Sequence, residues 1–126
     1  MAEASLKHCL VVDDSRVIRK VTCRILEQME FVPEEADSAQ SALEACRANM
    51  PDAILLDAQL SRADSFEFLK SLRRQRNGDH PVVVICTAEN NIPRITEALG
   101  AGANDYLLKP FDRTILQDKF AQVGLL

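Results

Sequence analysis

The sequence predicts an α/β protein with a doubly wound parallel sheet, in which helices cover both faces of the sheet and form a three-layer (βα)5 sandwich. Short runs of apolar, often β-branched residues recur along the chain, and each is followed by apolar residues at helical spacing. Consecutive parallel strands require a right-handed crossover, which a helix supplies. With 126 residues, of which 47% are hydrophobic, the chain is long enough for one such domain.

The first predicted unit begins with the strand Cys9–Val12, which stops at polar residues and is followed by a helix. The apolar positions that predict this helix are Val17, Ile18, Val21, Ile25 and Leu26. In the second unit, Phe31–Ala36 is expected to be an outer strand, because Pro33 has no amide proton to donate to a neighbouring strand. Ser38 then caps a second helix, since its hydroxyl can accept from a free amide of the first turn.

The two strands that follow are strongly apolar, as expected for strands buried on both faces. Ala53–Leu56 predicts a strand that ends at Asp57, and Val82–Cys86 predicts one that ends at Thr87. The apolar positions of the helix between them are Phe66, Leu69 and Leu72.

The last part of the chain completes the pattern with two helices and one strand. A helix is predicted over Ile92–Leu99, and Gly100 and Gly102 are expected to close it, because glycine adopts the left-handed conformation common at helix ends. Asp105–Leu108 predicts the fifth strand. The apolar positions of the last amphipathic helix are Ile115, Leu116, Phe120 and Val123.

Charge and composition exclude several classes of protein. Fifteen Lys and Arg residues against nineteen Asp and Glu residues give a net charge of −4, so we expect no nucleic acid and no membrane as partner. Met1–Lys7 lacks the apolar stretch of a signal peptide, and no run approaches the roughly 18 apolar residues of a membrane span, so we expect a cytoplasmic protein. The four cysteines show no Cys-x-x-Cys spacing and lie in apolar segments, which favours buried thiols over a disulfide or a zinc site.

Ligands of a doubly wound sheet bind beyond the carboxyl ends of its strands. The polar residues at those ends are Asp13, Asp14, Asp57, Thr87 and Lys109. Three carboxylates in one crevice repel one another unless a cation neutralises them, and Mg²⁺ prefers oxygen ligands. A carboxylate can also attack phosphorus and form an acyl phosphate when a metal and a cation offset the phosphoryl charge. The sequence therefore predicts a magnesium site with Asp57 as nucleophile, Lys109 as cation and Thr87 as hydroxyl donor.

Four segments at these strand ends carry a resemblance to a known family. They are Val11–Ser15, Ile54–Asp57, Cys86–Ala88 and Leu108–Phe111. With them the chain resembles the receiver domains of two-component response regulators, so residues 1–126 are expected to form one receiver domain. Within that family it is most similar to stand-alone chemotaxis regulators of the CheY type, particularly those of alphaproteobacteria. The resemblance implies a flavodoxin-like sheet with the strand order 2-1-3-4-5.

The resemblance also implies roles for individual residues. Asp57 accepts a phosphoryl group from a histidine kinase, and Tyr106 is the aromatic residue that moves with Thr87 on activation. The implied Mg²⁺ ligands are Asp13, Asp14, Asp57 and the backbone carbonyl of Gln59. The surface of the fourth helix, fifth strand and fifth helix then changes its affinity for a flagellar motor switch protein or a kinase of the pathway. Such a protein is a monomeric switch and not an enzyme, although it assists its own phosphorylation and dephosphorylation.

The segment 58–65 departs from the family pattern. Ser61 and Ser65 stand where proline and glycine are usual. Without proline the loop loses a preset φ, and a side chain at position 65 penalises any positive φ there. We therefore expect this loop to be more mobile or folded differently, with altered phosphorylation kinetics.

Three arginines near the end of the third predicted helix leave an alternative open. Arg73, Arg74 and Arg76 are expected to be solvated cations that meet the negative end of the helix dipole. The alternative is that they grip the phosphates of cyclic di-GMP, which would make the chain a diverged receiver that binds a nucleotide; a phosphate sink is a further possibility. An electron carrier or a phosphohydrolase fits poorly, because Asp13–Arg16 is acidic where a flavin phosphate would bind and Asp57 lacks a second acid two residues on.

Overall fold

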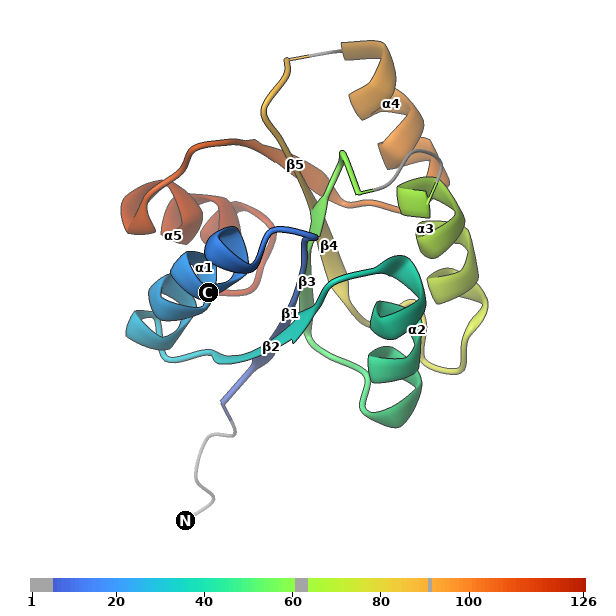
Figure 1. Ribbon diagram of the computed structural model, residues 1–126, viewed down its shortest axis with the longest axis horizontal. Helices are drawn as coiled ribbons and strands as arrows, with labels where there is room; N and C mark the ends of the chain where they lie inside the picture. Colours follow the sequence, from blue (N-terminus) through green and yellow to red (C-terminus); the bar gives the residue numbers. More distant parts are fainter. Residues whose placement is uncertain (1–5, 61–63, 91) are drawn as a thin grey trace.

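The computed structural model describes residues 6–60, 64–90 and 92–126. In this part of the chain five strands alternate with five helices (Figure 1). The strands are β1 His8–Val12, β2 Val32–Ala36, β3 Ala53–Asp57, β4 Val82–Thr87 and β5 Asp105–Leu108. The helices are α1 Arg16–Gln28, α2 Ala39–Ala48, α3 Asp64–Arg74, α4 Ile92–Ala101 and α5 Arg113–Gln122. Every predicted element is therefore present, and no helix of the described ranges is long and apolar enough to cross a membrane.

The strands form one parallel sheet in the order β2-β1-β3-β4-β5, which confirms the predicted doubly wound α/β fold. β2 lies at one edge, the position predicted from Pro33. Figure 1 shows α1 and α5 on one face of the sheet and α2, α3 and α4 on the other. The register pairs Val12 with Leu56 and Asp57 with Cys86, so the carboxyl ends of β1, β3 and β4 meet at the same edge.

Each face of the sheet carries its own apolar layer, because successive strand side chains point to opposite faces. Leu10, Ile54 and Leu56 point towards the helices α2 and α3. Cys9, Val11 and Leu55 point towards α1 and α5. Full burial of one such Leu or Ile side chain contributes about 1.5–3 kcal/mol. The two layers thus hold the central strands between helices and fix where their ends lie.

The helices α1 and α2 begin at serine caps. The hydroxyl of Ser38 accepts a hydrogen bond from the amide of Ser41 at 3.1 Å, and the Ser41 hydroxyl accepts from the amide of Ser38 at 3.2 Å. This reciprocal pair confirms the cap at Ser38 and starts α2. Ser15 caps α1 by accepting from the amide of Ile18 at 3.3 Å, so the chain turns into this helix directly after the acids of the β1 end.

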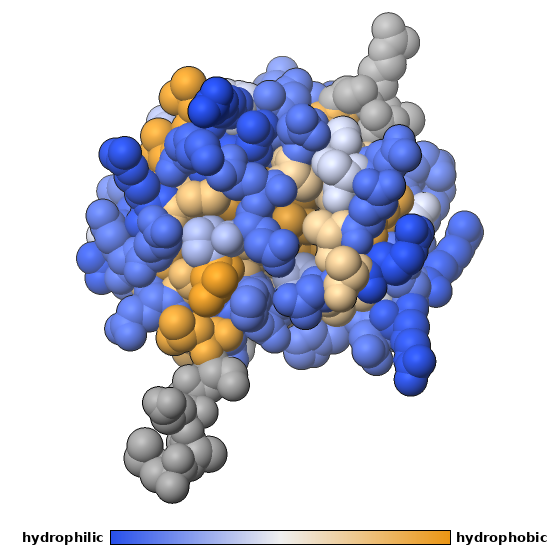
Figure 2. Space-filling model, turned by 60° about the horizontal axis from the view of Figure 1, so that its bottom comes forward, coloured by the Kyte–Doolittle hydropathy of each residue, from blue (hydrophilic) through white to orange (hydrophobic). Residues whose placement is uncertain are grey.

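Some of the apolar residues whose spacing predicted α1 and α5 are exposed. Val17 and Val21 are 70% and 53% exposed, whereas Thr22 and Leu26 are buried in α1. Ile115 of α5 is 44% exposed although its apolar neighbours in the pattern suggested a buried position. The spacing of apolar residues predicts a helix. It does not decide which side of the helix packs against the sheet when apolar residues lie on more than one side of the helix. On the face in Figure 2, hydrophobic residues likewise form small patches within a hydrophilic surface.

The end of α4 also differs from the prediction. Gly100 lies inside the helix, so its predicted role in closing α4 is wrong. Gly102 has a φ of 131°, in the region that favours glycine, and follows the last helical residue. A Cβ atom at position 102 would lie 3.0 Å from Cγ of Arg73, which adds a second reason for glycine there.

Arg73 is a structural residue, which corrects the expectation that all three arginines are solvated. Its Nε donates to the carbonyl of Gly102 at 3.0 Å, and its Nη1 donates to the carbonyls of Gly78 and Pro81, both at 2.8 Å. Its Nη2 donates to Oδ1 of Asn104 at 3.0 Å. The half-buried side chain therefore ties the end of α3 to the segment before β4 and to the turn before β5.

Candidate functional site

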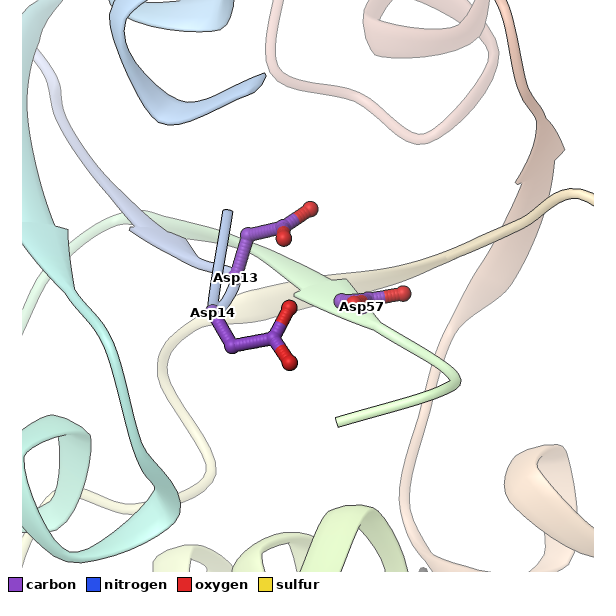
Figure 3. Close-up of side chains that lie close together, drawn as sticks. All are labelled: Asp13, Asp14 and Asp57. Carbon is purple, nitrogen blue, oxygen red and sulfur yellow. The ribbon is translucent and has the colours of Figure 1, made fainter. Parts of the chain in front are cut away.

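The ends of β1 and β3 bring three aspartates together. Asp13 and Asp14 follow β1, and Asp57 is the last residue of β3. Their side chains extend to the same side of this sheet edge (Figure 3), and an oxygen from each carboxylate lies within 4.8 Å of the other two. Asp13 and Asp57 are buried, whereas Asp14 is exposed. The three predicted acids therefore form one cluster that is open to solvent at Asp14.

Contacts from α1 and β2 hold Asp13 in place. Its carboxylate Oδ1 accepts from the amide of Ser15 at 2.9 Å, and its backbone carbonyl accepts from Nη1 of Arg19 at 2.8 Å. Arg19 is held in turn by Glu35 of β2, with Nε and Oε1 3.0 Å apart. This support could not be predicted from the sequence, because only the fold brings the Arg19 side chain back to the end of β1.

Lys109 places a positive charge between two of the acids. Its Nζ lies 3.0 Å from Oδ2 of Asp13 and 3.2 Å from Oδ1 of Asp57. Burial by itself lowers the pKa of this ammonium group, but the hydrogen bond to Asp13 and the charge of Asp57 outweigh it and raise the pKa above its usual value. Lys109 is therefore a permanent cation that touches the carboxylate of Asp57.

The donor set fits Mg²⁺, which takes carboxylate and carbonyl oxygens and keeps several of its waters. Three carboxylates against one ammonium group leave a charge of −2 for a divalent ion to neutralise. Gln59 is close to the same cluster, because its amide donates to Oδ1 of Asp57 at 3.1 Å. Asp13, Asp14 and Asp57 together with the peptide of Gln59 could therefore hold such an ion.

Thr87 ends β4 beside the cluster, but its hydroxyl is engaged with its own loop. It donates to the carbonyl of Glu89 at 3.0 Å and accepts from the Glu89 amide at 3.1 Å. Glu89 also accepts at Oε1 from the side-chain amide of Gln59 at 3.4 Å, which joins this loop to the one after β3. The predicted residue is thus at the predicted strand end, with its hydroxyl on Glu89 in this conformation.

Tyr106 lies on β5, the strand next to Thr87. The ring is half-buried against the apolar layer under α2, α3 and α4, and Nζ of Lys119 lies 5.5 Å from its centroid. Ion pairing with Asp105 holds Lys119 there, at 3.2 Å. Tyr106 therefore stands outside the carboxylate cluster, and its switching role stays a prediction.

The expectation for the segment 58–65 is corrected at its end. Ser65 lies within α3, and the positive φ values of described non-glycine residues are those of Glu30 and Asn77, so position 65 does not require glycine. The Ser65 hydroxyl donates to the backbone carbonyl of Asp57 at 3.0 Å, a contact that the sequence did not reveal. Ser61 lies outside the described residues.

The cysteines are free thiols, as predicted. Cys9, Cys46 and Cys86 are buried, and Cys23 is half-buried. Burial raises the pKa of Cys46 to about 11 and that of Cys86 to about 12. At neutral pH these groups are protonated core side chains, including Cys86, which directly precedes Thr87.

Comparison with known proteins identifies the family. The response regulator receiver domain matches residues 9–121 of the chain. The chain belongs to this family. The phosphate regulon transcriptional regulatory protein PhoB of Escherichia coli is 37% identical over 105 residues, which cover 83% of this chain and 46% of PhoB. The chain therefore spans about half the length of the curated relatives that it matches.

Solved structures confirm the CheY-like fold. The chemotaxis response regulator CheY4 of Vibrio cholerae has a TM-score of 0.87 and 27% identity, with 94% of this chain and 99% of CheY4 covered. The receiver domain of the sensor histidine kinase PA1611 of Pseudomonas aeruginosa has a TM-score of 0.83 and 30% identity, with 95% and 99% covered. That structure is described with a magnesium ion coordinated in its active site cleft.

Family membership carries general properties to this chain. Receiver domains are signalling modules of two-component systems that are phosphorylated on an aspartate and interact with a histidine kinase. They bind Mg²⁺ in an acidic site, and Asp13, Asp14 and Asp57 form an acidic cluster in this chain. They are generally not enzymes.

Proposed function

We propose that this receiver domain accepts a phosphoryl group on Asp57 from a histidine kinase, in a site that holds Mg²⁺. The observation that carries the proposal is the position of the Asp57 carboxylate, which contacts Lys109 and lies within 4.8 Å of Asp13 and Asp14. In the proposed site the ligands of the ion are Asp13, Asp14, Asp57 and the backbone carbonyl of Gln59.

Each residue has a separate task in the proposed transfer. Bound Mg²⁺ supplies positive charge that stabilises the transferring phosphoryl oxygens. A carboxylate oxygen of Asp57 forms the new bond to phosphorus, while the bond from phosphorus to the donor histidine nitrogen breaks and the histidine leaves. Lys109 stays protonated and contacts a phosphoryl oxygen. Thr87 releases the carbonyl of Glu89, which it contacts in this structure, and donates its hydroxyl to the phosphoryl group.

The proposed output surface is the one formed by α4, β5 and α5. Apolar side chains are exposed on it, namely Ile92 at 58%, Leu99 at 40%, Leu108 at 42% and Ile115 at 44%. Movement of Thr87 with Tyr106 shifts the population of conformers that bind a partner there. We propose a flagellar motor switch protein or a pathway kinase as partner, since one similar structure is a chemotaxis response regulator. In this role the domain is a cytoplasmic monomer without enzymatic activity.

The alternatives have less support. A role as cyclic di-GMP receptor depends on the arginine cluster, yet the guanidinium of Arg73 is engaged with backbone carbonyls, and Arg74 and Arg76 are the exposed members. A phosphate sink uses the same chemistry at Asp57 and leaves the α4, β5 and α5 surface without a partner. No observation favours it over a role in signalling output.

The test uses beryllofluoride, a phosphoryl mimic, with Mg²⁺ and amide spectra of the protein. The wild type is expected to show shifts at the cluster, at Thr87 and Tyr106, and along α4 and α5. Asp57→Ala is expected to show none, and Glu44→Gln, which removes an exposed charge on α2, is expected to respond like the wild type. A wild type that does not respond, or an Asp57→Ala variant that responds equally, contradicts the proposal.

A further inference from the structure

The hydroxyl of Ser65 connects the first turn of α3 to the end of β3. It donates to the backbone carbonyl of Asp57 at 3.0 Å, and the carbonyl of Ala58 lies 3.5 Å away. Ser65 is 4% exposed, so water has little access to this contact. The hydroxyl thus bonds directly to the backbone of the residue that carries the proposed nucleophile.

The carbonyl that Ser65 contacts also closes a tight turn. The amide of Leu60 donates to the same oxygen of Asp57 at 3.2 Å, which folds the chain over Ala58 and Gln59. Within this turn the amide of Gln59 donates to Oδ1 of the Asp57 carboxylate at 3.1 Å. The peptide of Gln59 and the side chain of Asp57 are therefore oriented together by the shape of the turn.

The other attachments of the turn show what Ser65 adds. The amide of Ala58 donates to the carbonyl of Cys86 at 2.8 Å, which fixes the start of the turn to β4. The Ser65 hydroxyl joins the same segment to α3. Without it, the Asp57 carbonyl retains the amide of Leu60 as its partner, and the turn keeps its attachments to Cys86 and, through the Gln59 side chain, to Glu89, but loses its link to α3.

We propose that Ser65 is a positioning residue for phosphoryl transfer, because its hydroxyl sets the Asp57–Leu60 turn and with it the directions of the Asp57 carboxylate and the Gln59 carbonyl. The inference rests on the proposed function of Asp57. Groups that orient metal ligands affect metal affinity strongly, since a ligand that can rotate must be ordered when the ion binds. Ser65 acts through these ligands and does not itself touch the phosphoryl group.

The test compares Ser65→Ala with two control variants. Ser71→Ala removes a hydroxyl from the same helix, and Val83→Ala removes buried methyl groups from the start of β4, away from the turn. Mg²⁺ affinity is measured from amide shifts during titration, and stability is measured by urea unfolding. Ser65→Ala is expected to weaken Mg²⁺ binding about tenfold, at the lower end of effects seen for such orienting groups. It should also shift the Gln59 amide resonance before any metal is added.

Both control variants are expected to bind Mg²⁺ like the wild type, although Val83→Ala loses stability. If Ser65→Ala binds Mg²⁺ with wild-type affinity, the inference is wrong. It is also wrong if Val83→Ala weakens Mg²⁺ binding as much as Ser65→Ala does, because the weaker binding would then result from the lower stability of the protein and not from the loss of the Ser65 hydroxyl. A wild type that binds neither Mg²⁺ nor beryllofluoride contradicts the proposed function first and removes the basis of this inference as well.

Discussion

Replacing Arg73 with alanine is expected to lower the free energy of unfolding by about 4 kcal/mol, because several charge-assisted hydrogen bonds are lost and the entropy of the released side chain offsets only part of the loss. The guanidinium donates to the carbonyls of Gly78, Pro81 and Gly102 and to Oδ1 of Asn104, at distances of 2.6 to 3.0 Å. These acceptors lie in two separate connections, so the variant loosens the entries to both β4 and β5.

The magnitude follows from the number of acceptors and from their exposure. A hydrogen bond to a charged group contributes about 1.5–3 kcal/mol net. Arg73 is half-buried, so water can reach part of the site and the low end of this range applies to each of the acceptors. Release of the side chain recovers about 2 kcal/mol of rotamer entropy. Arg73→Lys keeps the charge but has a single donor nitrogen, and it is expected to lose about 2 kcal/mol because the planar fork is absent.

The assay is urea unfolding followed by circular dichroism, with Arg74→Ala as the matched control. Arg74 is exposed on the same helix, so its removal is expected to change stability by at most about 0.5 kcal/mol. If Arg73→Ala is no more destabilising than Arg74→Ala, the structural role assigned to Arg73 is refuted. The same result would return Arg73 to the group of arginines that are available to a phosphate ligand.

Three further predictions concern the carboxylate cluster and the opposite end of the sheet. Lys109→Ala should still accept a phosphoryl group at Asp57. It should lose most of the amide shifts that beryllofluoride induces in α4 and α5, because the ammonium group that would contact the phosphoryl oxygen beside Asp57 is absent. Asp14→Ala should weaken Mg²⁺ binding about tenfold or more in calorimetric titration, since a ligand is removed. Burial raises the pKa of Asp52, but hydrogen bonds from His80 and from a β1 amide outweigh it and lower the pKa. This contribution to stability is present above the unfolded carboxyl pKa and is lost as the pH falls below about 4, so Asp52→Asn should flatten the acid limb of a pH–stability profile.

Separate outcomes contradict these three predictions. An unchanged set of α4 and α5 shifts in Lys109→Ala would show that the lysine does not transmit the signal. Equal Mg²⁺ affinity in Asp14→Ala and in the remote control Glu44→Gln would remove Asp14 from the ligand set. Carboxyl groups titrate at about pH 4, so the comparison covers the range from about pH 5 to about pH 3. If the pH–stability profile of Asp52→Asn parallels that of the wild type over this range, the hydrogen bonds to Asp52 add no stability.

The sheet and the main site residues could be predicted because they depend on short segments. Asp57, Thr87 and Lys109 each follow an apolar run, and parallel strands place all their carboxyl ends at one edge. The sequence therefore predicts that these three residues lie at the same edge of the sheet, although it does not predict the distances between them. The strand order itself came from the resemblance, since spacing alone does not decide which strands are neighbours.

Other features depend on residues far apart in the chain and could not be predicted. Arg73 contacts Gly102, which lies 29 positions away, and a charged residue at a helix end looks the same in sequence whether it is solvated or not. The exposed Val17 and Val21 of α1 show a different limit. Their apolar spacing predicts the helix but not which of its faces turns towards the sheet. Packing against the sheet decides that Leu26 is buried.

Ser65 shows how the structure changes the meaning of a correct sequence observation. The sequence identified position 65 as a departure from glycine, and a side chain there was expected to strain or loosen the loop. In the structure this residue is helical, and its hydroxyl bonds back to Asp57. The side chain thus adds a contact that glycine lacks, a result that depends on α3 beginning beside the end of β3.

Chemical mapping of the modified residue shows whether Asp57 forms an acyl phosphate. The protein is incubated with acetyl phosphate and Mg²⁺ and then reduced with borohydride, which converts a phosphorylated aspartate to homoserine, and its peptides are sequenced by mass spectrometry. The predicted result is homoserine at position 57 alone, with none formed when Mg²⁺ is withheld or in Asp57→Ala. Conversion at Asp13 or Asp14, or no conversion at all, would contradict the proposed phosphorylation of Asp57.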